Sequence, residues 1–361
     1  NILKMRNSAN DGWIDLRTLT GGLTSAADAT INSITVGKGA NSVAGNTVLG
    51  ESALDASVTG GNNTAIGKNA LTALTSATNN VAVGGFTLDA VTSGSNNTGL
   101  GFQAGTALTT GSSNTAVGQF SLATATETTN NTAVGQAALA STTTGNHNTA
   151  LGQSSLTANT TGAENCAVGQ ICLDANTTGS NNVAMGRSAL GSNTTASNNT
   201  GIGNFALGAN TTGDLHTAIG SNALDANTTG SSNVAIGSLS LTDNTTGSSN
   251  VAIGIQALQD NTTASNNTAV GRDALKLNTT GAGNVAVGAN ALDANTTGTD
   301  NAAIGGSSLS SNTTASFNTA LGSNSLRDNT TGTSNAAVGI NALLNNTTAS
   351  NNTALGALEL F

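Results

Sequence analysis

The chain has 361 residues, a net charge of −9 and only 7% charged residues, and it contains neither proline nor tyrosine. Without a basic stripe it lacks the electrostatic footprint of nucleic-acid binding, and no apolar run approaches the ~20 residues needed to span a membrane. Gly, Asn, Thr, Ser and Ala dominate, a composition that would be typical of disorder if these residues did not recur at fixed intervals.

Residues 1–45 differ in kind from the rest and are predicted to form a hairpin followed by a cap. The stretch Leu3–Leu16 predicts strand, turn and strand, because Asn-Asp-Gly at 10–12 is a strong hairpin signal. Trp13, the only Trp, is expected to anchor this unit. Residues 31–45 are expected to form an irregular first coil, since an open solenoid end exposes strand edges that recruit other chains.

From residue 46 to 361 the chain follows one period. Nineteen glycines fall on a strict 17-residue grid from Gly50 to Gly356. Self-similarity at a fixed short period indicates a stacked, quasi-one-dimensional protein. We therefore expect two regions, a lead-in at 1–45 and a repeat array at 46–361.

Positions in each unit are numbered here from the grid glycine. Position −4 is Asn except for His216, position −2 is mostly Ala, and position −1 is always aliphatic; position +4 is Leu except at Gly105. Position +7 is Asn in twelve consecutive units, Asn159 to Asn346, each followed by Thr-Thr. The residues expected to form stacked ladders are Asn182, Asn233, Asn250, Asn267, Gly186, Gly237, Gly254, Gly271, Leu190, Leu241, Leu258 and Leu275.

One unit is predicted to be one coil of an all-β parallel β-solenoid or β-roll, with about nineteen coils in all. A run such as residues 233–237, Asn-Val-Ala-Ile-Gly, is short, β-branched and bounded by turn residues. The Asn-Thr-Thr-Gly segments are interpreted as turns. Stacking about 4.8 Å apart would make the Asn column a side-chain amide ladder and the −1 and Leu columns two apolar seams, in a rod roughly 90 Å long.

The predicted core is thin. Each unit supplies only two large apolar side chains, which is little against the entropy lost when the whole unit is ordered. Association of several chains would also bury the Ala column and the Thr/Val column at −3. We therefore expect a homotrimer, although the repeat period by itself does not determine the number of subunits.

No cluster of residues predicts chemistry, so we expect no catalytic residue, no cofactor and no metal, and a chain that is not an enzyme. His147 and His216 are expected to be simple substitutions, with three copies of His216 converging on a trimer axis as the alternative. Cys166 and Cys172 are expected to be small, unbridged residues. The acidic residues after the Leu column are expected to be solvated: Asp55, Asp89, Asp174, Asp225, Asp293, Asp243, Asp260 and Asp328.

Three further sequence features bear on other activities. The phenylalanines from Phe86 to Phe317 are scattered along the chain, which argues against the aromatic cleft of a polysaccharide depolymerase. The Asn-Thr-Thr triplets match the N-glycosylation pattern, but their periodicity has a structural explanation. Thr rows leave an ice-binding solenoid as a minor alternative, weakened because adjacent Thr residues point to opposite sides.

The motif Asn-[Ser/Thr]-Val-Ala-Ile-Gly resembles the head repeat of trimeric autotransporter adhesins, which builds a trimeric left-handed parallel β-roll. Those heads usually have a shorter period, with a stalk and membrane anchor that are not visible here. The longer unit at 267–281, the opening Leu3–Ile14 and the lead-in Ile34–Gly39 look more like bacteriophage tail fibres.

The resemblance implies a homotrimeric, extracellular fibre shaft on a virion, involved in attachment to the host surface. The implied partners are the chain itself, a host cell-surface receptor that could be a glycan, and other tail or baseplate proteins, with no nucleic acid and no membrane insertion. The head of a bacterial surface adhesin is the alternative. Because the chain opens without Met and stops inside a unit at Phe361, we expect the array to continue beyond it.

Overall fold

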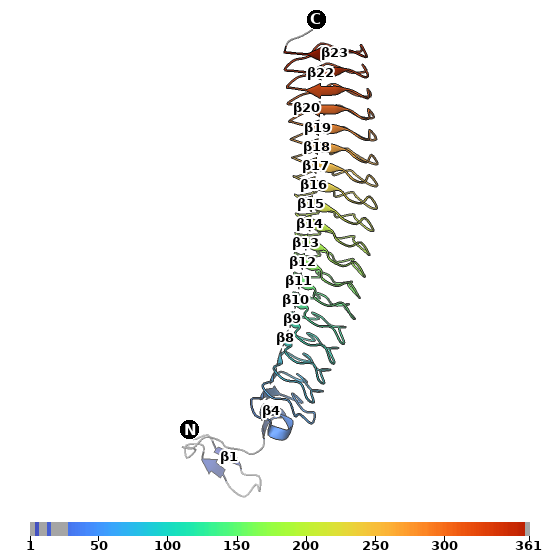
Figure 1. Ribbon diagram of the computed structural model, residues 1–361. Helices are drawn as coiled ribbons and strands as arrows, with labels where there is room; N and C mark the ends of the chain where they lie inside the picture. Colours follow the sequence, from blue (N-terminus) through green and yellow to red (C-terminus); the bar gives the residue numbers. More distant parts are fainter. Residues whose placement is uncertain (1–3, 7–12, 16–27, 358–361) are drawn as a thin grey trace.

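The computed structural model describes residues 4–6, 13–15 and 28–357 and shows a slender, gently curved rod of stacked coils (Figure 1). Two short strands near the N-terminus, β1 (Lys4–Arg6) and β2 (Trp13–Asp15), pair antiparallel. The predicted turn between them and the side chain of Trp13 lie outside what the structure describes.

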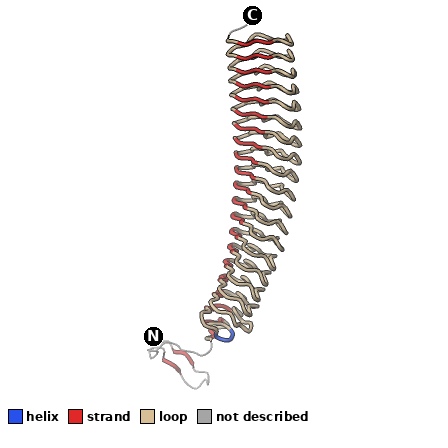
Figure 2. Tube along the Cα trace, in the orientation of Figure 1, coloured by secondary structure: helices blue, strands red, loops and turns tan. Residues whose placement is uncertain are grey.

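Each coil contributes one short strand, three residues long from β6 onward, to a single column along the rod (Figure 2). The first strand of the column, β5, is one residue longer. The strands of the column are β5 (Thr47–Gly50), β6 (Thr64–Ile66), β7 (Val81–Val83), β8 (Thr98–Leu100), β9 (Thr115–Val117), β10 (Thr132–Val134), β11 (Thr149–Leu151), β12 (Cys166–Val168), β13 (Val183–Met185), β14 (Thr200–Ile202), β15 (Thr217–Ile219), β16 (Val234–Ile236), β17 (Val251–Ile253), β18 (Thr268–Val270), β19 (Val285–Val287), β20 (Ala302–Ile304), β21 (Thr319–Leu321), β22 (Ala336–Val338) and β23 (Thr353–Leu355).

The register of this column equals the sequence period. Within the run from β5 to β23, successive strands pair parallel at an offset of one repeat unit, as Val234 with Val251 and Ile236 with Ile253. β4 and β23 lie at opposite ends of the rod, so the sheet is an open ladder (Figure 1). The predicted all-β parallel solenoid is thus confirmed, with nineteen stacked strands and therefore eighteen steps between them.

The N-terminal end of the ladder is built differently. β3 (Ala29–Ile31) and β4 (Ile34–Gly37) form an antiparallel pair, and β4 pairs antiparallel with β5. A short 3-10 turn, η2 (Ala40–Ser42), follows. The carboxylate of Asp28 accepts hydrogen bonds from the backbone N–H groups of Lys38 and Gly39, which fixes the chain at this end.

The core is a narrow column of small residues and leucines inside the coils. The −2 residue is the buried member of every strand in the column, and the Leu side chains at +4 are buried from Leu54 to Leu343. The prediction that the Ala column would need partner chains for burial was therefore wrong. A single chain encloses it, because the coil closes around small side chains.

The corners rely on unusual backbone conformations. Beyond the first coil the grid glycines adopt positive φ, as Gly237 does at 134°. Leucines at +4 also have positive φ, as in Leu258 at 53°, which costs on the order of 1 kcal/mol for an L-residue. The Leu258 side chain is fully buried and its N–H donates to Ala274 O over 2.9 Å, so packing and hydrogen bonding offset this cost.

Candidate functional site

Two ladders of buried asparagine stabilise the rod. In the first, at −4, Asn250 donates from Nδ2 to Ala264 O over 2.9 Å, and its Oδ1 accepts the backbone N–H of Asn267 over 3.0 Å. In the second, at +7, Asn261 Nδ2 donates to Asn244 Oδ1 over 2.8 Å and to Ala264 O over 3.0 Å. One carbonyl oxygen, that of Ala264, thus joins the two ladders here, and the second ladder runs through the coils from Asn159 onward.

This pattern corrects two expectations. The −4 ladder links each side chain mainly to the backbone of the next coil rather than amide to amide, because the Nδ2 group turns across the coil. The Asn of each Asn-Thr-Thr triplet forms a true amide ladder inside the rod, so it is not mainly a turn residue. That burial also keeps Asn176 or Asn261 from acting as a glycosylation acceptor in the folded chain.

The structure places the predicted ladder residues in aligned columns. The asparagines Asn182, Asn233, Asn250 and Asn267 and the leucines Leu190, Leu241, Leu258 and Leu275 have no exposed surface, and the glycines Gly186, Gly237, Gly254 and Gly271 have φ between 131° and 135°. All twelve serve the stacking of coils. None of them reaches the outer surface with a functional group.

Replacement of Asn250 by alanine is expected to lower the free energy of unfolding of the surrounding coils by about 1–3 kcal/mol, because the buried N–H of Asn267 loses its acceptor. Ala264 O keeps its bond from Asn261. Native-state hydrogen exchange would measure the change. Asn204→Ala, at an exposed corner, is the control, and equal losses in the two variants would contradict the role assigned to the ladder.

His216 replaces Asn in the first ladder and reproduces its bonding. Nε2 lies 2.7 Å from Gly230 O, and Nδ1 lies 3.2 Å from the backbone N of Asn233. These partners assign the neutral ring with its proton on Nε2. Burial lowers the pKa of His216 below its usual value. Since the ring is 1% exposed within its own coil, it does not converge with other copies on an axis.

The outer surface of the strand column is apolar. In every strand from β5 to β23 the residues at −3 and −1 face outward and the middle residue is buried. We call the outward residues at −3 and −1 of β5–β23 the strand face. The prediction that position −1 supplies one of the two large apolar core side chains of each unit was wrong, because period-2 alternation around a buried Ala turns both flanking side chains outward.

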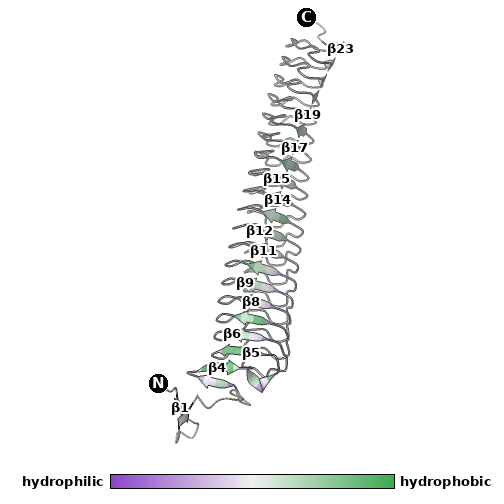
Figure 3. Ribbon diagram, turned by 90° about the vertical axis from the view of Figure 1, so that its left-hand side faces the viewer, coloured by the Kyte–Doolittle hydropathy of each residue, from purple (hydrophilic) through white to green (hydrophobic). Residues whose placement is uncertain are grey.

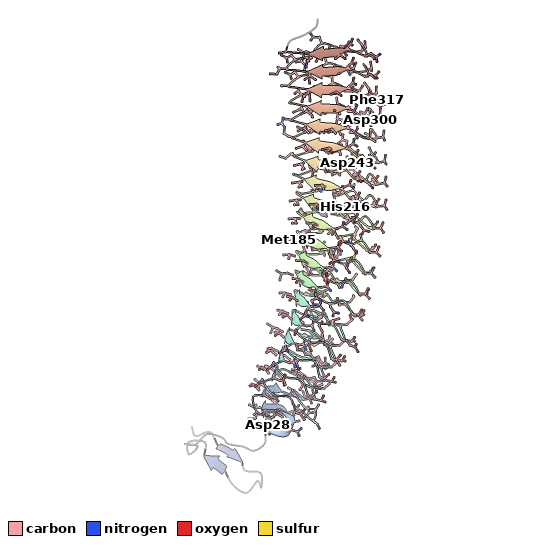
Figure 4. The ribbon with its side chains drawn as sticks, viewed as in Figure 1. Asp28, Met185, His216, Asp243, Asp300 and Phe317 are labelled. Atoms are coloured by element: carbon pink, nitrogen blue, oxygen red, sulfur yellow. The ribbon has the colours of Figure 1, made fainter. Side chains whose placement is uncertain are left out.

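Charge is absent from the strand face. Its residues are Thr, Val, Ala and one Cys at −3, and Leu, Ile, Val and one Met at −1. Every charged residue from Glu51 to Asp328 lies at another position of the coil. Figure 3 shows several strand arrows in hydrophobic colour along this column, and Figure 4 shows Met185 at its edge. An uncharged, exposed apolar stripe of this length is a candidate interaction surface.

A second candidate surface lies at the corner after the glycines, positions +1 and +2. Phe86, Phe102 and Phe120 pack edge to face, with ring centroids 6.1 Å and 5.9 Å apart. These phenylalanines are therefore gathered, not scattered, because +1 and +2 of successive coils meet. Further along the same corner, Gln153 bridges Gln136 and Gln170 through exposed amides, and Arg187 lies over the ring of Phe205.

The acidic residues form no metal site. Within the described residues, no three His, Cys, Asp or Glu side chains gather closely enough to hold a metal ion. Asp174 and Asp293 are only half-buried, and desolvation raises the pKa of both carboxyl groups. Asp243 contributes to the raised pKa of Asp260 in the next coil, after desolvation as the main cause.

The two cysteines are unbridged and differ in exposure. Cys172 is buried, its Sγ lies 3.2 Å from Ala184 O, and desolvation raises the pKa of its thiol to about 12. Cys166 lies on the strand face and is partly exposed.

We expect iodoacetamide at pH 8 to leave Cys172 unmodified in the folded chain, because a thiol with a pKa near 12 is almost entirely protonated there. In denaturant the same residue should react fully. Peptide mass spectrometry would measure modification at each cysteine. Rapid labelling of native Cys172 would show that the coil opens readily at this point.

The Thr pairs present only one member to the outside. Thr245 at +8 donates its hydroxyl to Thr262 O over 3.0 Å, whereas Thr246 at +9 is exposed. On the strands, Thr or Val at −3 is matched by an aliphatic residue at −1. Neither arrangement supplies the two outward Thr rows on a strand that would favour ice binding, so the geometry does not support that alternative.

Comparison with protein-family models, curated proteins and solved structures returns no match. Among the residues that the structure describes, no helix has the length and apolarity required to cross a membrane. The surfaces of the rod are therefore the basis for a functional inference.

Proposed function

We propose that this chain is the shaft of a homotrimeric bacteriophage tail fibre, extracellular on the virion, that takes part in attachment to the host surface. The observation that carries the proposal is the unbroken register of nineteen stacked strands. Rods of this kind hold a recognition element at a distance. The resemblance of the repeat and of the N-terminal segment to tail fibres supports the assignment.

The physical role of the shaft is mechanical. Two buried amide ladders and the strand hydrogen bonds run parallel to the long axis, so bending or stretching the rod strains many bonds at once. Corner side chains that repeat every coil can also make many weak contacts with a repetitive surface such as a glycan, which adds avidity. Other tail or baseplate proteins would hold the shaft at one end.

The head of a bacterial surface adhesin is the second candidate, since its repeat motif is shared. The neighbouring genes separate the two: tail and baseplate genes accompany a fibre, whereas an adhesin head is followed by a coiled coil and a membrane barrel. Nothing in the described geometry supports an enzyme.

Antibodies against the rod provide the direct test. Immunogold labelling should place the chain on the tails of phage particles. Label confined to the outer surface of bacterial cells would favour the adhesin. Label restricted to the cell interior, with free particles and cell surfaces unlabelled, would overturn both.

A further inference from the structure

We propose that the strand face is the surface along which copies of this chain pack against one another, so that the apolar stripe lies inside the fibre. The inference rests on the proposed function for the presence of several copies and adds the face that joins them.

The strand face exposes large apolar side chains along its whole length. At position −1 these side chains are more than a third exposed in nine coils, with Ile253 at 37% and Met185 at 42%. Intervening coils expose the same position partly. The nine are Leu49, Leu100, Leu151, Met185, Ile219, Ile253, Ile304, Leu321 and Leu355.

The corner after the glycines carries exposed apolar side chains, such as Phe102 and Phe120, together with charged ones. Ile255 at the corner is 55% exposed, and the same corner position of the next coil is Arg272. A partner packed on this corner would have to desolvate charged side chains such as Arg272. The strand face has no such interruption in nineteen coils, which is typical of a surface that is desolvated in the assembled protein.

The area is adequate for a stable contact. Three residues per strand give a width of about 10 Å, and eighteen steps give a length of roughly 90 Å. The footprint is on the order of 900 Å², comparable to the about 800 Å² that each partner contributes to a standard protein interface.

The backbone determines what kind of partner fits. The N–H and C=O groups of the strands are already paired with the coils above and below, as in Val251 N–H to Asn267 O at 2.8 Å. The face therefore offers side chains only, and a partner cannot join it as an added strand. Association must come from packing of one face on another.

The repeat points to a second copy of this chain as that partner. A body that matches the stripe over all nineteen coils must carry apolar groups at the same spacing of about 4.8 Å and over the same length. Another strand face meets both conditions, with small Thr and Val side chains at −3 opposite larger Ile and Leu side chains at −1.

Two triple variants of the full chain, each adding three negative charges, test the proposal. The first changes the strand face with Ile219→Glu, Ile253→Glu and Ile304→Glu, which are 38%, 37% and 42% exposed. The matched control changes other surfaces with Ile255→Glu, Leu277→Glu and Ile340→Glu, which are 55%, 43% and 58% exposed. Native mass is measured by light scattering, and circular dichroism verifies that each variant keeps its β-structure.

The native chain and the control are expected to have a mass three times that of the 34.8 kDa chain, and the strand-face variant the mass of one chain. A monomeric native chain, or a strand-face variant that keeps the native mass, would overturn the proposal. If both variants dissociate equally, the interface between chains does not lie specifically on the strand face, and the proposal fails. If the strand-face variant unfolds, crosslinking of native Cys166, which lies on the strand face, decides instead. Cys166 crosslinks between chains would support the proposal, and crosslinks only through surface lysines such as Lys276 would contradict it.

These results are independent of the immunogold test. A chain labelled on phage tails but monomeric in solution would overturn the interface and leave the proposed function. A trimer found only inside cells would support the interface and overturn the proposed function.

Discussion

Replacement of Gly305 by alanine is expected to lower the free energy of unfolding of the adjoining coils by about 2–4 kcal/mol. Gly305 has φ of 136°, and an added Cβ would lie 2.5 Å from the carbonyl carbon and oxygen of Gly322 in the next coil. Neither backbone atom can move without opening the ladder. Because each coil contacts only its neighbours, the defect should divide the rod into two cooperative halves.

The adjacent residue supplies the control for this prediction. Gly306→Ala would place its Cβ 3.9 Å from Ser323 Oγ, in ordinary contact, and Gly306 does not have a positive φ. Hydrogen exchange in the two flanking coils would measure the free energy of local opening for each variant. Similar losses in both would contradict the view that the glycine grid exists to allow this close approach.

Acidification is expected to destabilise the middle of the rod at His216, which lies within the coils near the midpoint (Figure 4). Protonation would convert Nδ1 from acceptor to donor, leaving the N–H of Asn233 without its partner and a cation in a buried site. Burial lowers the pKa of His216 more strongly than the backbone contact with Gly230 and the nearby carboxylate of Asp214 raise it.

The direction of the pH effect follows from the lowered pKa of the folded His216. Above the usual His pKa of 6.5 both folded and unfolded states are neutral, and the stability is fully present. As the pH falls below 6.5, the unfolded chain binds a proton that the folded chain excludes, so stability declines by up to about 1.4 kcal/mol per pH unit.

His216→Asn restores the residue found at this position in the neighbouring coils and should remove the pH dependence. The thermal midpoint, measured by circular dichroism at pH 7.5 and pH 5.5, should fall on acidification in the native chain and much less in the variant. His147→Asn, at an exposed position, is the matched control and should behave like the native chain. A native midpoint that is unchanged between these pH values would contradict the mechanism.

The stacking of coils could be predicted from the sequence, because the sequence period equals the offset between paired residues in successive coils. Any structure that repeats once per unit and places Ala235 beside Ala252 must carry equivalent residues in columns. The buried Asn column at −4 also follows, since an amide at every step can satisfy its hydrogen bonds only by stacking.

The direction of the side chains was harder to predict. Three-residue strands such as Val234–Ile236 are too short for alternation to reveal which members face inward, and hydrophobicity alone wrongly favours a core position for the aliphatic residue at −1. Ala is the smaller residue, and next to the buried leucine at +4 only a small side chain fits on the inner side of the strand. The small size of position −2 was the signal that could have identified the inner face.

Two other features had no sequence signal of the usual kind. Leucine avoids positive φ, so Leu241 at 52° and Leu258 at 53° would not be predicted at a corner. The contact of Phe86, Phe102 and Phe120 depends on which of +1 and +2 points toward the next coil. Neither is evident from spacing in the sequence alone.

The constant offset of one repeat unit between paired strands has a genetic consequence. Homologous recombination between any two units, after Gly203 and after Gly254 for example, would remove or duplicate whole coils and leave a junction chemically like all the others. The length of the rod can therefore change in steps of about 4.8 Å while the contacts between coils stay the same. A lineage carrying such a gene can lengthen or shorten its rod by gaining or losing whole repeats.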